Sequence, residues 1–281
     1  MQNGKISLAG PTTSFRPELE AARGTLRESL GALHNLDQLL KSIRVGPKAI
    51  GSVLDDVNAA CAPMRQAASE LLTAIGKQPA AREACHALDL FFTSRVEELG
   101  RELSRARQQR MNAKNRLALE RVVSRLWQEL DTASGLITLL HQSIWSPSIR
   151  IDMGGLIQET TVHRMDSANS VTIEATLAQV EGSVEASVRP RVAIGMLAHG
   201  VTLVAGARPE RSPPVNPTIV VDSLAGGCRL NVVDRQERGT PVAIPACRII
   251  GPTLPSLAAC AELAGARIEH AADHSQFAIF W

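Results

Sequence analysis

The chain has 281 residues, of which 44% are hydrophobic and 3% aromatic, which excludes wholesale disorder and predicts roughly two domains. Its 30 basic and 28 acidic residues nearly balance, so nucleic acid is not expected as a partner, nor is an anionic membrane. No stretch of about 18 apolar residues predicts a membrane span, and no secretory pattern opens the sequence, so we expect a cytoplasmic protein.

Composition divides the chain near residue 146. Gly and Pro are sparse before this point, and short β-branched runs with turn signals follow it. We expect a flexible N-terminus over 1–16, an α-helical bundle over 17–145 that mediates dimerisation, and an α+β domain over 146–281.

Two amphipathic helices are predicted at the start of the bundle. Apolar residues recur at three- and four-residue steps across 17–44 and again across 48–75. Gly46 and Pro47 are expected to end the first helix. Pro63 lies inside the second helix and is expected to kink or split it.

The stretch from 79 to 144 predicts a helical hairpin. Its second half carries a heptad seam that can pack in a bundle or across a dimer, formed by Leu119, Val123, Leu126, Leu130, Ala133, Ile137 and Leu140. The apolar face is poor over 104–116, so we expect a bend there, with one unbroken helix as the alternative. The same segment carries Arg105, Arg107, Arg110, Lys114 and Arg116, which indicate either a solvated face or a patch for an acidic partner.

The second half alternates predicted strands and helices. In chain order we expect a strand at 149–153, a helix at 154–168, a strand at 171–177, a helix at 190–206, a hairpin turning at Ala225-Gly226-Gly227, a helix at 252–265 and two closing strands. These elements predict helices on one face of a mixed, mostly antiparallel sheet.

Several blocks, in this order, resemble a sensor histidine kinase over roughly 112–281. LLHQSIW (139–145) resembles the segment before the ATPase domain, and IRIDMGGLIQET (149–160) resembles the first strand and helix of a GHKL-type ATPase. RVAIGMLAHGVTLVAGARPE (191–210) resembles its ATP-binding helix. LNVVDRQERGTP (230–241) and GPTLPSLAACAELAGARIEH (251–270) resemble its glycine motifs. The resemblance implies an α+β sandwich of the histidine-kinase ATPase type after the helical hairpin.

The resemblance also implies a vestigial nucleotide pocket. By register, the family's Mg²⁺-binding asparagine and its neighbouring glutamate fall on Val204 and Gly200, which supply no oxygen ligand. Asp234 stands at the adenine-binding aspartate, but the glycines after it are replaced, and Gly239 could serve only after a register shift. Gly251 remains in the last motif, among prolines that remove backbone donors. We therefore expect no cofactor, with ATP and Mg²⁺ binding weak or lost.

Two histidines are candidate phosphoacceptors. His86, in EACHALDLFF, fits an exposed helix position if the bend at 104–116 exists, and His34, in LGALHNLDQLL, fits if the first two helices form the hairpin. Neither carries the family's flanking residues, so an ordinary helix-surface histidine is the alternative for each. His141 is expected to be structural. The five cysteines lack any CxxC spacing, so neither a zinc site nor a disulfide framework is expected.

These features predict a two-component signal-transduction protein. It would act as a phosphotransfer intermediate or a non-catalytic regulator, docking a response-regulator receiver domain as a homodimer. Two alternatives stay open: an active ATP-dependent sensor histidine kinase with an atypical pocket, and a helical scaffold or adaptor whose basic segment meets DNA or a protein.

Overall fold

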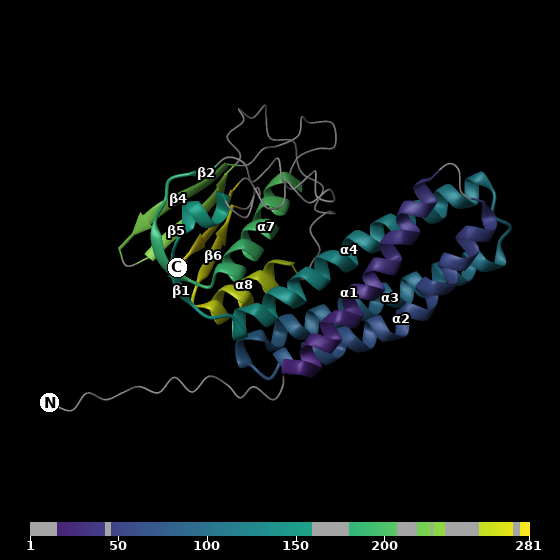
Figure 1. The fold of residues 1–281 in the computed structure, drawn as a ribbon, viewed down its shortest axis with the longest axis horizontal. Coiled ribbons are helices and arrows are strands. Elements are labelled where there is room, and N and C mark those ends of the chain that lie inside the picture. The colour runs from purple at the N-terminus through teal and green to yellow at the C-terminus, as the bar shows by residue number, and fades with distance from the viewer. Residues whose placement is uncertain are drawn as a thin grey trace. The chain divides into compact units, whose positions relative to one another are not determined.

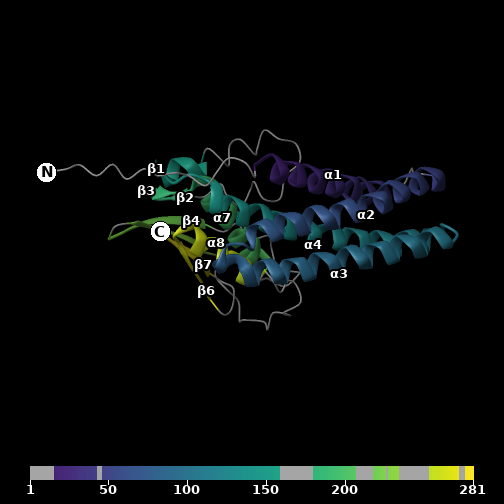
Figure 2. The same ribbon diagram turned by 90° about the horizontal axis from the view of Figure 1, so that it is seen from below.

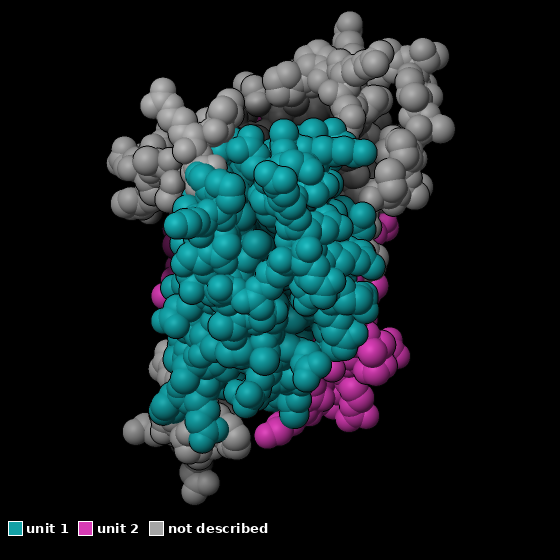
Figure 3. Space-filling model, turned by 90° about the vertical axis from the view of Figure 1, so that its right-hand side faces the viewer, with its two compact units in different colours: residues 1–74, 92–131 teal, residues 75–91, 132–281 magenta. Residues whose placement is uncertain are grey.

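The structure is a computed structural model that describes residues 16–42, 46–158, 180–206, 218–225, 227–233, 253–271 and 276–281. The chain forms two compact units, coloured separately in Figure 3. Unit 1 comprises 1–74 and 92–131, and unit 2 comprises 75–91 and 132–281. This division groups the ends of two long helices with the C-terminal half, whereas the sequence predicts a boundary at 145–146. The expected flexible segment 1–16 lies almost wholly outside the described residues.

Four long helices form the first half of the chain, and they lie side by side in both ribbon views (Figures 1 and 2). They are α1 (Arg16–Lys41), α2 (Pro47–Ile75), α3 (Arg82–Gln108) and α4 (Ala113–Trp145). The helices predicted at 17–44 and 48–75 are confirmed. α1 already ends at Lys41, and Pro47 begins α2 instead of ending α1, because a proline suits the first turn of a helix, where its missing N–H is not needed.

Pro63 does not split α2, which stays helical from Pro47 to Ile75. Its ring is exposed, whereas Val57 and Met64 elsewhere around the same stretch of helix are fully buried. Packing on both sides of the proline therefore outweighs the cost of about 3 kcal/mol that an interior proline carries.

The predicted bend between α3 and α4 is confirmed. α3 ends at Gln108 and α4 begins at Ala113, inside the segment 104–116. Asn112 caps α4, since its Oδ1 accepts a hydrogen bond from the backbone N–H of Asn115 at 2.9 Å. The Asn115 side-chain amide in turn donates to the Arg110 carbonyl at 3.0 Å. These side-chain bonds satisfy backbone groups that a helix end leaves open.

The core of unit 1 is built from one apolar face of each helix. Residues at 3% exposure or less include Leu26, Leu33, Leu36, Leu40, Ile50, Leu54, Val57, Met64, Leu71, Phe92, Leu99, Leu103, Val123, Leu126 and Leu130. Burying a side chain of this size contributes about 1.5–3 kcal/mol. The heptad seam predicted in α4 thus lies in the interior of the chain itself.

Unit 2 contains a mixed, mostly antiparallel sheet, as predicted. Its strand order is β2-β4-β5-β7-β6, with β2 parallel to β4 and every other pair antiparallel. The strands are β2 (Val180–Glu181), β4 (Thr218–Leu224), β5 (Gly227–Val233), β6 (Arg267–His270) and β7 (Gln276–Phe280). β1 (Ile149–Asp152) pairs with β3 (Glu185–Val188) in a separate antiparallel ribbon.

Two helices lie on one face of this sheet (Figure 1). α7 (Pro190–Gly206) packs on β5 and β7, α8 (Thr253–Ala264) packs on β6, and the two helices contact each other. The helices predicted at 190–206 and 252–265 are therefore confirmed, as is the β4–β5 hairpin. Of the helix predicted at 154–168, residues 153–158 are helical and the rest lies outside the described residues, as does the strand predicted at 171–177.

Candidate functional site

His86 lies on the exposed side of α3, near its beginning. A short 3₁₀ turn, Pro79–Ala81, leads into the helix. Ala84 and Leu88 turn the opposite side of α3 into the core, at 3% and 0% exposure. With the described residues, His86 makes no hydrogen bond and no ion pair, so both imidazole nitrogens are unoccupied by this part of the chain.

The surface around His86 combines charge with one large apolar side chain. Arg82 and Glu83 are exposed one turn before it. Leu90, one turn after it, is 58% exposed, more than any other large apolar side chain among the described residues. Positions four residues apart share one helix face, so His86 and Leu90 form one accessible strip. The sequence did not single out Leu90, although its position out of phase with the buried Ala84–Leu88 stripe is the signal that could have found it.

His34 is packed in unit 1 instead of being presented to solvent. Its ring lies 4.7 Å from the Trp127 ring, centroid to centroid, at 46°. Its Nδ1 is buried and has no hydrogen-bond partner among the described residues. Nearby, burial raises the pKa of Asp131, and the charge of His34 lowers it in part. This arrangement leaves His34 less suited than His86 to meet a second macromolecule.

The other described histidines also differ in exposure. His141 is 8% exposed and stacks against Trp145 with ring centroids 4.5 Å apart, in keeping with the structural role expected for it. His199 on α7 faces Gly135 of α4, and burial lowers its pKa to about 4. A histidine held neutral in this way acts as a packing residue at physiological pH. His270 is exposed at the end of β6.

Of the residues expected in a nucleotide pocket, Gly200 has a fully described environment. It lies on α7 directly against the buried ring of Phe277, so that a β-carbon there would overlap Cδ1 and lie 2.7 Å from Cε1. No carboxylate side chain fits at that position. Val204 follows one turn later on α7, with its side chain outside the described part of the structure. Asp234, Gly239 and Gly251 also lie outside the described residues, so the five positions are not brought together within them.

Much of the basic segment 104–116 is engaged in intrachain contacts. Arg107 forms an ion pair with Asp55 of α2, and Arg105 forms one with Glu102 on its own helix. The Arg116 guanidinium points to the carbonyl of Ser42 at 3.5 Å. The segment therefore helps to hold the helices of unit 1 together, as well as presenting charge to solvent.

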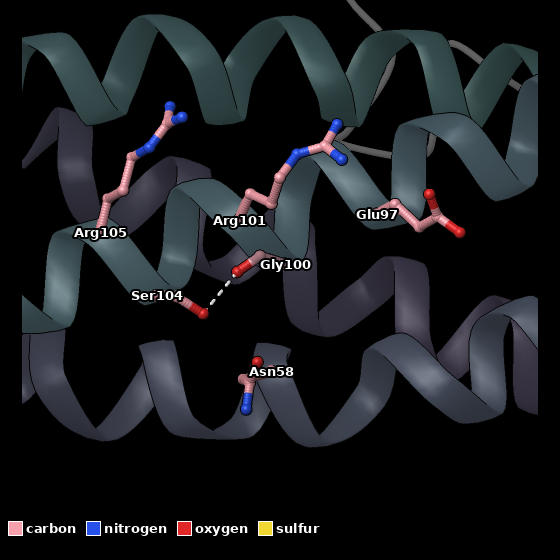
Figure 4. A pocket seen from close by; sticks show the side chains of 6 residues that line it. All are labelled: Asn58, Glu97, Gly100, Arg101, Ser104 and Arg105. Carbon is pink, nitrogen blue, oxygen red and sulfur yellow. Dashed lines mark hydrogen bonds between the residues drawn. The ribbon is translucent and has the colours of Figure 1, made fainter.

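A hollow of about 610 Å³ lies between α2 and α3 in unit 1. Figure 4 shows its lining: Asn58, Glu97, Gly100, Arg101, Ser104 and Arg105. Gly100 borders open space, since a β-carbon there would meet nothing within 4 Å. The Ser104 hydroxyl donates to the Gly100 carbonyl at 2.8 Å, and the two arginine side chains point away from Asn58 (Figure 4). No nucleophile meets a base here, so the lining has no catalytic arrangement.

Metal and thiol chemistry find little support in the described residues. They contain no group of three or more His, Cys, Asp or Glu side chains placed to hold a metal ion. Cys61, Cys85, Cys228 and Cys260 are free thiols, and burial raises the pKa of Cys85 to about 11. A thiol with a raised pKa is a poor nucleophile. Within the same residues, no helix is both long and apolar enough to cross a bilayer.

The accessible strip at His86 and Leu90 is thus the best-formed candidate site. Comparison with known proteins adds no family to this description. No protein-family model matches the chain, and no curated protein is significantly similar to it.

Proposed function

We propose that this chain is a two-component phosphotransfer protein whose phosphoacceptor is His86. The observation that carries the proposal is the position of that imidazole: exposed on a helix whose opposite face is buried, unoccupied by the described residues, and one turn from the exposed Leu90. An imidazole exposed in this way is open to approach by a phosphoryl donor on a second molecule.

The partner would be the receiver domain of a response regulator, as the resemblance to sensor histidine kinases implies. A lone pair on an imidazole nitrogen would attack the phosphorus of the receiver's aspartyl phosphate. The N–P bond would form as the O–P bond breaks, the carboxylate would leave, and the second imidazole nitrogen would lose its proton to water. Leu90 would supply apolar contact area for docking.

The α+β part of unit 2 would be an ATPase-like domain of the GHKL type that has lost its nucleotide function. Two observations support this part of the proposal. A mixed sheet carries α7 and α8 on one face, as that fold requires at the level of layers. Gly200, the position expected to carry an acidic group, is in contact with Phe277, which leaves no room for such a side chain.

The direct test uses phosphoramidate, a small phosphoryl donor to histidine, and a panel of isolated receiver domains phosphorylated with acetyl phosphate. We expect an acid-labile phosphoryl group on the wild-type chain, lost in His86→Gln and retained in His34→Gln. Label that survives His86→Gln and disappears in His34→Gln would reverse the assignment. No transfer from any receiver would remove the function.

A second comparison separates docking from chemistry. Leu90→Ala should slow transfer from the receiver while leaving labelling by phosphoramidate unchanged, because only the larger donor needs the apolar contact. Leu117→Ala is the matched control, since Leu117 is 47% exposed but belongs to unit 1. Titration with Mg-ATP completes the test, and micromolar binding would favour the active kinase instead.

A further inference from the structure

We infer that the α1–α2 hairpin occupies, within one chain, the place that a second copy would take against the α3–α4 hairpin. The helical bundle of unit 1 is then complete in a single chain, its seams need no second copy to cover them, and we expect the protein to be a monomer.

The contacts within unit 1 close the bundle between the two hairpins. On one side, α1 meets α4 through His34 and Trp127, whose rings are 4.7 Å apart. Arg116 of α4 also reaches the Ser42 carbonyl at the end of α1, at 3.5 Å. These contacts join the first helix of the chain to the last helix of the bundle.

On the other side, α2 meets α3 through two charged pairs. Arg107 contacts Asp55, and Arg65 lies 4.0 Å from Glu97. Within the second hairpin, Arg95 Nε of α3 lies 2.8 Å from Glu129 Oε2 of α4. The helices therefore follow one another around the bundle in the order α1, α4, α3, α2. The short connection from α1 to α2 completes the circle.

The apolar seams face inward and are already covered. Leu119, Val123, Leu126 and Leu130, the part of the α4 seam that lies in unit 1, are all 6% exposed or less. A heptad seam is compatible with a dimer only if a second chain covers it. Here the seam is buried within the chain's own bundle, in which Leu33 of α1 and Val57 of α2 are fully buried as well.

The outside of the bundle offers little for a second copy to hold. Among the described residues of unit 1, Leu117 is the one large apolar side chain that stands exposed, at 47%. A stable interface buries about 800 Å² on each partner, around an apolar centre. On the parts of α3 and α4 that belong to unit 2, Leu90 and Trp145 are also exposed, at 58% and 36%, but three single side chains fall well short of such an interface.

A monomeric bundle has a consequence for stoichiometry. Two copies of a phosphoacceptor hairpin would carry two equivalent histidines in one bundle. In this chain, the residues of α2 include no histidine, and His34 of α1 is packed on Trp127. One bundle therefore presents His86 once.

The first test is the mass of the full chain by light scattering after gel filtration, across a wide concentration range. We expect the single-chain mass of 30.1 kDa at every concentration. Twice that mass, constant on dilution, would overturn the inference.

The second test asks whether the bundle forms within or between chains. Asp55→Cys and Arg107→Cys are placed together in the full chain with Cys61→Ala, which removes a half-buried native thiol. Both sites are exposed and their native side chains touch, so a short bismaleimide should link them with little effect on the fold. We expect a link within one chain, detected by denaturing mass spectrometry.

The matched control mixes two variants after joint refolding, one carrying Asp55→Cys alone and the other Arg107→Cys alone, both with Cys61→Ala. Links between chains in the mixture, or a product of two-chain mass from the double variant, would show a bundle shared between copies and would overturn the inference. Absence of any link in the double variant would overturn the closed bundle itself. None of these outcomes depends on phosphotransfer, so the inference stands or falls separately from the proposed function.

Discussion

Replacing Gly200 with alanine is the sharpest test of how unit 2 is packed. In most exposed helix positions this change is favourable, because alanine has a helix propensity about 1 kcal/mol better than glycine. At Gly200 the new β-carbon would overlap Cδ1 of Phe277 and lie 2.7 Å from its Cε1, and the Phe277 ring is only 1% exposed. The ring cannot move aside without disturbing the sheet.

The expected change in the free energy of unfolding is the difference between the cost of overpacking and the gain in helix propensity. Overpacking a dense core costs about 1–3 kcal/mol, and a contact this short lies at the upper end of that range. Subtracting the propensity gain leaves a net loss of about 1–2 kcal/mol. Gly100→Ala is the matched control in α3, where a β-carbon meets nothing within 4 Å, and it should gain up to about 1 kcal/mol.

Thermal unfolding followed by circular dichroism and calorimetry measures both variants. A loss of 1 kcal/mol lowers the midpoint by about 2–4 °C in a domain of this size class. We expect Gly200→Ala below and Gly100→Ala above the wild type. Equal midpoints, or a more stable Gly200→Ala, would refute the contact between α7 and Phe277, and with it the argument that Gly200 has no room for an acidic side chain.

Three further predictions concern single positions. Burial lowers the pKa of His199 from 6.5 to about 4, so His199 becomes protonated in the unfolded chain at a higher pH than in the folded chain. The contribution of His199 to the free energy of unfolding is therefore complete above pH 6.5 and declines by at most about 3 kcal/mol between pH 6.5 and pH 4. His199→Phe should flatten this part of the pH profile measured by urea unfolding. Pro63→Ala should raise the free energy of unfolding by about 1–3 kcal/mol, because it restores a backbone N–H donor inside α2. Chemical denaturation measures this difference, and a variant less stable than the wild type would show that α2 needs the proline. Trp127→Ala should uncover His34, so that phosphoramidate labels His34 weakly in the His86→Gln background. If His34 stays unlabelled in this double variant, packing on Trp127 is not the reason for its protection.

The helices could be predicted from the sequence because their signals are local. Apolar residues at three- and four-residue steps gave α1 and α2 to within a few residues, and the poor apolar face over 104–116 located the bend. Asn112, which caps α4, lies in that segment and marks a helix start by its own chemistry. The β4–β5 hairpin was equally local, since its Gly-rich turn separates two β-branched runs.

What could not be predicted depends on contacts between distant residues. The pattern of the α4 seam is the same whether a second chain or α1 and α2 cover it, so periodicity alone could not choose between a dimer and a closed bundle. The structure does not test the homodimer predicted from the sequence, and the closed bundle inferred above argues against it, because the seam on which that prediction rested is buried within the chain. The contact of Gly200 with Phe277 likewise joins two elements that no local pattern connects.

The choice between the two candidate histidines depends both on local sequence pattern and on contacts between distant residues. Helix phase alone leaves both His34 and His86 outside the main apolar stripe, so the sequence treated them alike. Trp127 on α4 then covers one face of His34 and helps to bury its Nδ1, whereas no described side chain bonds to His86. The packing of α1 on α4 therefore accounts for the different exposure of the two histidines, and our proposal places the phosphoacceptor at His86, beside Leu90.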